Sequence, residues 1–268
     1  MKYNNFVAED PQQGEKEKMK KLLTAAAAMM VLAGCSSAAQ PTPTPEAEVD
    51  YAAKSEGVMT YAEYAAAELD TEVVVETYVQ AKQSWWEDKA TIYTQDPEGG
   101  YFIYEMPISE EDYNKLTEGT KIKVTGYKSE WAGEVEITDA SYEIEEGTWV
   151  AEPVNADAVW GSPDMINFQN QKVVFTGVTV QDYTTDEGAT GAAFAYKNPT
   201  DKTDDLYIQL MKGDTMYEFC VEYYLCNNET EVYKAVEALN VGDVVDVEGF
   251  LYWYNGPNLH ITKVTAAK

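Results

Sequence analysis

The sequence predicts an all-β protein with short helices, in which one module of five strands occurs twice. Composition gives the first indication, because the chain contains 20 tyrosines and many valine, isoleucine and threonine residues, which β-sheets favour. Periodicity gives the second, since short runs of these residues alternate in part between apolar and polar positions and end at turn residues. The third is that both halves of the chain show the same order of elements.

The first module is expected to open with a helix. Thr60 and Glu63 have the spacing of a capping box, and the alanine-rich helix that they begin is predicted to end near Asp70. Strands are then predicted over residues 73–81, 90–95 and 101–106, with a turn at 96–100, followed by a short helix over 109–116 and strands over 121–127 and 134–142.

The second module is expected to repeat this plan after a helical or irregular stretch over residues 157–168. Strands are predicted over 172–182, 206–211 and 217–225, a short helix over 229–239, and strands over 244–253 and 259–264. The acidic residues from Asp201 to Asp205 are expected to form a solvated loop, because they lack the alternating ligands and the glycine of a calcium loop.

The spacing of glycines supports a duplication. In each module a leucine precedes one glycine by three residues, and further glycines follow seven and fourteen residues later. The matching positions are Leu116, Gly119, Gly126 and Gly133 in the first module and Leu239, Gly242, Gly249 and Gly256 in the second. Similar elements at similar offsets are better explained by a repeated module than by chance.

Three strands, a helix and two strands is the order of the OB-fold, a five-stranded barrel. The segments 121–127 and 245–250 resemble those of tandem OB-like domains in uncharacterised secreted bacterial lipoproteins, over roughly residues 58 to 265. The resemblance implies two barrels, expected at residues 56–148 and 149–268, and it implies no activity.

The N-terminal region gives an expected location. Leu32-Ala33-Gly34-Cys35 has the form of a lipobox, and residues 19–34 have the basic start and short apolar run of a signal peptide. The run is shorter than the roughly 20 apolar residues of a membrane-spanning helix. Residues 1–18 are interpreted as an extra segment or a misassigned start, and residues 35–55 as a lipidated cysteine with a Pro/Thr-rich linker. By resemblance to lipoproteins, acylated Cys35 is expected to anchor the chain to the outer face of a bacterial membrane.

The charge of the chain argues against one class of partner. The formal net charge is −28 and the sequence contains no arginine. Nucleic-acid phosphates are bound by basic surfaces, so no nucleic-acid partner is expected.

Aromatic residues collect at the loops that border the ligand face of an OB-fold. These candidate binding residues are Trp85, Trp86, Trp131, Tyr183, Tyr252, Trp253 and Tyr254. Exposed rings there would form a platform for a glycan or an envelope protein. The alternative is that the tryptophans pack at barrel ends, and at least one of adjacent Trp85 and Trp86 is expected to be packed.

No catalytic motif is found, so the expected function is a binding or adaptor protein without a cofactor or a metal. A cell-envelope hydrolase that uses carboxylates and a purely structural envelope component remain alternatives. His260, the single histidine, is expected to face outward from its strand. Cys220 and Cys226 are either a disulfide, which needs a turn between them, or two free thiols.

Overall fold

The computed structural model describes residues 50–199 and 201–267. The chain divides into two units, Met1–Glu48 and Val49–Lys268, and the description below concerns the second unit. The expected signal peptide, the expected lipidation site Cys35 and most of the expected linker lie outside the described residues. No helix within the described residues is long and apolar enough to cross a membrane.

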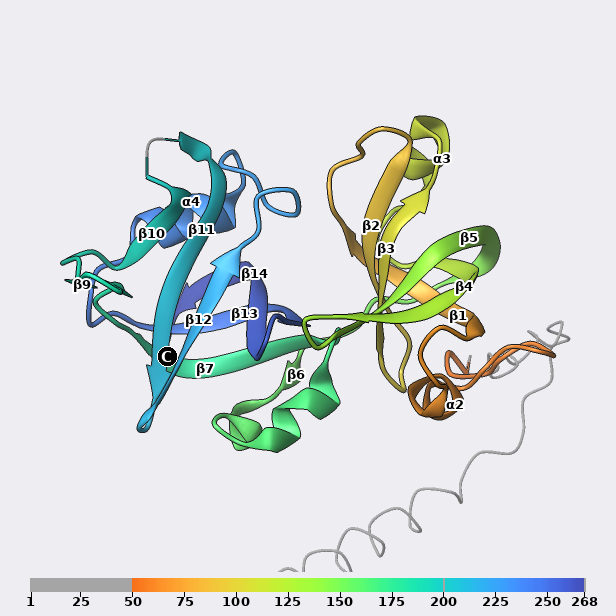
Figure 1. Ribbon diagram of the computed structural model, residues 1–268, viewed down its shortest axis with the longest axis horizontal. Helices are drawn as coiled ribbons and strands as arrows, with labels where there is room; N and C mark the ends of the chain where they lie inside the picture. The colour runs from red at the N-terminus through yellow and green to blue at the C-terminus, as the bar shows by residue number, and fades with distance from the viewer. Residues whose placement is uncertain (1–49, 200, 268) are drawn as a thin grey trace, which may run out of the picture. The chain divides into compact units, whose positions relative to one another are not determined.

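The first module is a closed barrel of five strands in the order β1-β2-β3-β5-β4 (Figure 1). The strands are β1 (Glu72–Lys82), β2 (Lys89–Gln95), β3 (Gly100–Pro107), β4 (Thr120–Trp131) and β5 (Glu134–Thr148). β3 and β5 pair in parallel, whereas the other neighbours are antiparallel. The short helix α3 (Glu110–Lys115) connects β3 to β4. The expected all-β, OB-like fold is therefore confirmed.

Alternation along the strands fills this barrel. On β4, Ile122 and Val124 are fully buried, while Lys121 and Lys123, which alternate with them, are only partly buried. Helix α2 (Tyr61–Ala66) covers one end of the core with Tyr64, and its N-terminus has the predicted capping box between Thr60 and Glu63. The helix is shorter than expected, because Ala67 already has an extended backbone.

The second module forms a ring of the same kind. Its pairings run from β7 to β11, β12, β14, β13 and back to β7, and β12 pairs with β14 in parallel. These strands are β7 (Lys172–Val180), β11 (Asp201–Lys212), β12 (Thr215–Val221), β13 (Val244–Trp253) and β14 (Pro257–Ala266). Corresponding strands thus occupy corresponding places in the two modules.

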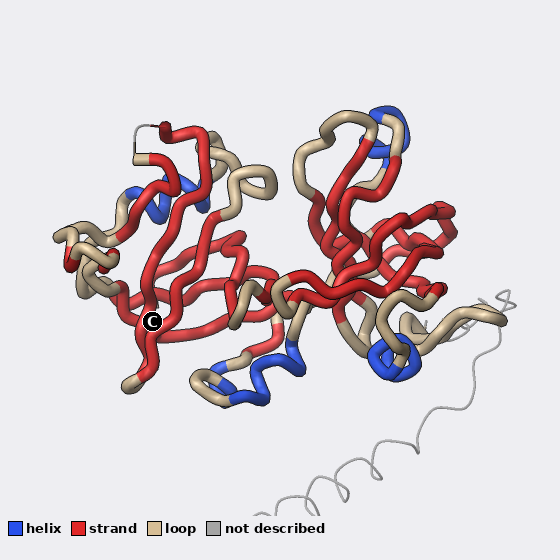
Figure 2. The backbone as a smooth tube through the Cα atoms, viewed as in Figure 1, coloured by secondary structure: helices blue, strands red, loops and turns tan. Residues whose placement is uncertain are grey.

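Shorter elements complete the second module (Figure 2). They are β6 (Val154–Asn155), η1 (Asp157–Val159), η2 (Pro163–Phe168), β8 (Thr184–Thr185), β9 (Gly188–Ala189), β10 (Phe194–Asn198) and α4 (Glu231–Glu237). β10 extends the sheet beside β11 and was not predicted from the sequence. Helix α4 buries Val232, Tyr233 and Val236 in the core.

The repeated glycines mark equivalent close approaches between strands. A Cβ added at Gly126 on β4 would lie 2.8 Å from the carbonyl oxygen of Thr138 on β5. A Cβ at Gly249 on β13 would lie 2.2 Å from the carbonyl oxygen of His260 on β14. Only glycine lets the fourth and fifth strands approach this closely in either barrel.

Two expected boundaries were wrong. Residues 201–205 begin β11 rather than forming a loop, and β12 ends at Val221 rather than at Leu225. Asp205 Oδ1 accepts a hydrogen bond from the Tyr223 backbone N–H at 2.9 Å, so its carboxylate holds the turn that follows β12. Such side-chain capping of a turn gives no periodic signal in the sequence.

Candidate functional site

The two barrels meet at a joint of hydrogen bonds and aromatic rings. Gln169 Nε2 donates to the Gly133 carbonyl at 2.8 Å, and the Asn255 N–H donates to the Ala132 carbonyl at 2.7 Å. The rings of Tyr93 and Phe250, one from each barrel, stack with centroids 4.6 Å apart. Polar and apolar contacts together fix this joint within the unit Val49–Lys268.

Glu134 lies at the centre of the joint and is fully buried. Its Oε2 accepts hydrogen bonds from the Trp253 backbone N–H at 2.8 Å and from Gln169 Nε2 at 3.2 Å. Burial raises the pKa of the Glu134 carboxyl well above its ordinary value. Glu134 is consequently a structural link between the barrels rather than a charged group open to solvent.

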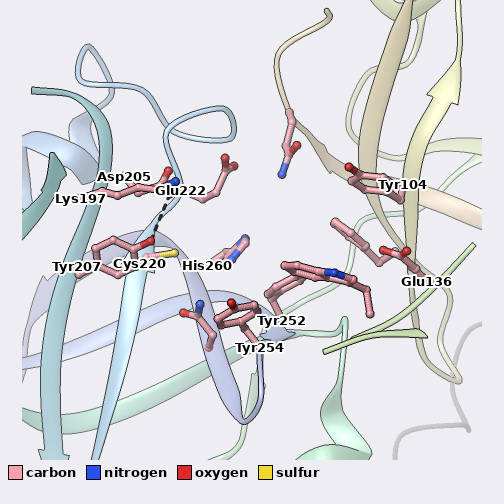
Figure 3. Close-up of a pocket in the computed structure, with 14 residues that line it drawn as sticks. Tyr104, Glu136, Lys197, Asp205, Tyr207, Cys220, Glu222, Tyr252, Tyr254 and His260 are labelled. Atoms are coloured by element: carbon pink, nitrogen blue, oxygen red, sulfur yellow. Dashed lines mark hydrogen bonds and ion pairs between the residues drawn. The ribbon is translucent and has the colours of Figure 1, made fainter. Parts of the chain in front are cut away.

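Beside the joint lies a cleft of about 620 Å³ between the barrels (Figure 3). Its walls come from β3, β4 and β5 of the first barrel and from β10 to β14 of the second. The lining residues are Gln83, Phe102, Tyr104, Trp131, Glu136, Lys197, Asp205, Tyr207, Cys220, Glu222, Tyr252, Tyr254, Asn258 and His260. This volume falls within the range of sites for small organic ligands.

Three exposed rings form what we call the aromatic rim of the cleft: Tyr104, Trp131 and Tyr254. They are 42%, 56% and 51% exposed. Trp131 is the last residue of β4, Tyr254 directly follows the corresponding strand β13, and their ring centroids lie 5.2 Å apart. The rim therefore combines equivalent strand ends from both modules and leaves apolar ring surface open to a ligand.

His260 is only 6% exposed, so the expectation that it faces outward was wrong. Its Nδ1 lies 2.7 Å from the Tyr93 hydroxyl of the other barrel, and its ring stacks on Tyr252 with centroids 4.5 Å apart. Burial lowers the pKa of His260 to about 3, which makes the imidazole neutral near pH 7. Its Nε2 has no partner within residues 50–199 and 201–267, although the side chain lines the cleft (Figure 3).

Three carboxyl groups line the cleft from opposite sides: Glu136, Asp205 and Glu222. Burial, with repulsion by Glu105, raises the pKa of Glu136, and burial raises the pKa of Glu222 to about 7. Asp205 Oδ2 lies 3.1 Å from Lys197 Nζ. Across the described part of the chain, no group of three or more His, Cys, Asp or Glu side chains is placed to hold a metal ion.

Cys220 and Cys226 are free thiols in the structure, which is the second of the two alternatives left by the sequence. Cys220 is buried against the cleft, and burial raises the pKa of its thiol well above the ordinary value. Burial also raises the pKa of the Cys226 thiol, to about 11. Neither thiol has the lowered pKa of a reactive nucleophile.

The seven aromatic residues that the sequence suggested as a binding site do not all lie in one place in the structure. Trp131, Tyr252 and Tyr254 line the cleft. Trp86 is 69% exposed and lies with Tyr224 in an adjoining hollow of about 340 Å³. The remaining three lie elsewhere. Trp85 donates a hydrogen bond from Nε1 to the Ile108 carbonyl, and Trp253 packs against the core of the second barrel. Tyr183 follows β7 and is half-buried.

Most polar residues of the cleft were missed by sequence reasoning. Glu136, Glu222 and His260 each fall at one position of a run that the sequence predicts as a strand, and a polar residue at such a position is typical of a solvated face. Their burial depends on the second barrel lying against the first, for which the sequence has no local signal.

No protein-family model and no curated protein matches this sequence. Among solved structures, a murine DNA-binding protein bound to double-stranded DNA is similar at 11% identity, covering 73% of this chain and 96% of that chain with a TM-score of 0.32. The Ifi202 HINa domain in complex with 20-bp double-stranded DNA is similar at 11% identity, covering 75% of this chain and 97% of that chain with a TM-score of 0.31. A single-stranded DNA-binding protein from Thermus aquaticus is similar at 14% identity, covering 75% and 96% with a TM-score of 0.22.

These comparisons correct two expectations from the sequence. The function was expected to be glycan or envelope-protein binding, and nucleic acid was excluded as a partner. The three similar structures are instead described as DNA-binding proteins or as complexes with DNA. Neither expectation is retained. At these identities and TM-scores, DNA binding is a property of those proteins and is not transferred to this chain.

Proposed function

We propose that the protein binds a small organic molecule in the cleft between its two barrels, without converting it chemically. The observation that carries this proposal is the aromatic rim, in which rings from equivalent strand ends of both barrels border one cavity. Small-molecule sites are typically concave, lined by aromatic residues and supplied with a few polar groups that orient the ligand.

Polar groups of this kind lie deeper in the cleft. The neutral imidazole of His260 is held by Tyr93 and by the Tyr252 ring, so its unpartnered Nε2 keeps a fixed direction. The surrounding joint of hydrogen bonds fixes the two walls relative to each other. A preformed site loses little conformational entropy when a ligand binds.

A titration of tryptophan fluorescence with a library of neutral, anionic and cationic small molecules tests this proposal. A ligand of the cleft is expected to change the emission of Trp131 and to saturate at one molecule per chain. Trp131→Ala and Tyr254→Ala should each weaken binding about tenfold, because ring contact with the ligand is lost. Tyr127→Ala is the matched control, since Tyr127 is 45% exposed on β4 but does not line the cleft.

Single-stranded and double-stranded oligonucleotides are included as contrasting probes. Saturable oligonucleotide binding that Trp131→Ala abolishes, with no response to any small molecule, would replace this proposal with a nucleic-acid site. Recovery of an altered ligand would contradict binding without turnover.

The location remains a proposal from the sequence. We propose that the chain is a lipoprotein anchored through Cys35 at the outer face of a bacterial membrane, supported by the Leu32-Ala33-Gly34-Cys35 motif and the preceding apolar run. Metabolic labelling with an alkyne-bearing fatty acid should mark the protein, and Cys35→Ser should abolish the label. Equal labelling of both forms would contradict the anchor.

A further inference from the structure

Acidic groups outnumber basic groups in the lining of the cleft. The charged groups of the lining comprise the three carboxyl groups and one ammonium group, that of Lys197. Lys197 is already engaged, because its Nζ lies 3.1 Å from Asp205 Oδ2 and 3.8 Å from Asp204 Oδ1. No cation of the described residues lies within ion-pair distance of Glu136 or Glu222.

Glu136 is the more unusual of these two residues. It is only 7% exposed, yet no hydrogen-bond donor from the described residues reaches its carboxyl group. The side chain projects from β5 into the cleft (Figure 3). With no protein partner, this largely buried carboxyl group is open only to the cleft, and a donor or a positive charge on a ligand would supply the missing interaction.

Glu222 faces the cleft from the second barrel and is held rigidly. Its Oε1 accepts the Tyr224 backbone N–H at 3.1 Å, and its Oε2 accepts the Leu225 N–H at 2.8 Å. The turn after β12 therefore fixes the position of this carboxyl group. A ligand that enters the cleft meets acidic groups on two opposing walls with the aromatic rim at its edge.

We propose that the ligand is an organic cation, a substituted ammonium whose charge lies between Glu136 and Glu222 and whose carbon groups contact the aromatic rim. This inference rests on the proposed function and specifies its ligand class. Ring faces attract an ammonium through their quadrupole, and the attraction grows where water is excluded. The net charge of −28 also raises the local concentration of cations around the protein.

Isothermal titration calorimetry with matched charged and uncharged probes tests whether the ligand must be a cation. The cationic probes are choline, a linear diamine and an alkylguanidinium, and dimethylbutanol serves as the uncharged isostere of choline. At least one cation is expected to bind, and choline is expected to bind about tenfold more tightly than its isostere. Glu136→Gln and Glu222→Gln should each weaken binding of the cation about tenfold, because the negative charge of the carboxylate is lost.

Glu143→Gln is the matched control variant. Glu143 lies on β5 like Glu136, but it is exposed and does not line the cleft. Glu136→Gln keeps the shape of the side chain and removes a buried carboxyl without a partner, so this variant is expected to fold with at least the stability of the parent chain. An unfolding curve measured on each sample checks that the parent chain and the variants are all folded when their binding is compared.

The possible results separate this inference from the proposed function. Binding of neutral or anionic molecules at the aromatic rim, at least as tight as that of the cations, would overturn the cationic ligand and leave the small-molecule site standing. A cation that binds equally to the parent chain and to Glu136→Gln and Glu222→Gln would also overturn it. If no probe binds, charged or neutral, both proposals are contradicted.

Discussion

The Tyr93 hydroxyl in the first barrel lies 2.7 Å from Nδ1 of His260 in the second. Both side chains are buried, and burial raises the pKa of the Tyr93 hydroxyl well above its ordinary value. The phenol and the imidazole are therefore both neutral near pH 7, and the bond between them is one between uncharged groups. It links the joint of the barrels to the base of the cleft.

Removal of this bond tests its contribution to stability. Tyr93→Phe keeps the ring that stacks on Phe250 but leaves His260 Nδ1 buried without a partner. We expect the free energy of unfolding to fall by about 1–2 kcal/mol, measured by urea denaturation. An unchanged denaturation midpoint and slope would show that the bond contributes nothing net.

Substitution of the equivalent glycines tests the repeated barrel closure. Gly126→Ala and Gly249→Ala each place a Cβ against the neighbouring strand, so each is expected to lower the free energy of unfolding by about 2 kcal/mol or more. Gly242→Ala is the comparison, because open space surrounds that position and only its φ of +93° opposes a side chain. Its expected cost is about 1 kcal/mol. A larger loss in Gly242→Ala than in Gly249→Ala would contradict the role of close approach.

The sequence alone was sufficient to predict the two barrels, but it did not predict the cleft between them. Alternation along β4 and the offsets of Gly126 and Gly249 are local features, and each predicted its element correctly. The bond between Tyr93 and His260 joins residues 167 positions apart in the chain. Its existence depends on how two folded barrels dock, which is decided by many weak contacts and leaves no periodic pattern.

The free thiols give a prediction about oxidation. Because Cys220 is buried and the pKa of Cys226 is raised to about 11, both should react slowly with a maleimide in the native protein and quickly in denaturant. The purified protein is expected to show the same melting temperature with and without a reducing agent. A mass two hydrogens below the reduced chain, together with a melting temperature that falls on reduction, would indicate a disulfide instead.

The carboxyl group of Glu222 gives a prediction about pH. Burial raises its pKa from an ordinary value of 4.5 to about 7, so between these pH values the folded protein retains a proton that the unfolded chain has released. The free energy of unfolding contributed by this group is therefore fully present below about pH 4.5 and falls as the pH rises through about 7. His260 acts in the opposite direction, because its lowered pKa makes the folded protein less stable as the pH falls below about 6.5.

Comparison with Glu222→Gln isolates the Glu222 effect, since His260 is common to both proteins. The amide cannot titrate, so the variant should gain stability relative to the parent chain as the pH rises from about 4.5 to 7. Glutamine has one acceptor oxygen and loses one of the two backbone hydrogen bonds, which shifts its stability by an amount independent of pH. The difference in free energy of unfolding between the parent chain and Glu222→Gln is therefore measured by urea denaturation at a series of pH values. The change of this difference with pH is the decisive quantity. A difference that stays constant across this window would show that Glu222 titrates with its ordinary pKa and that the cleft does not bury its carboxyl group.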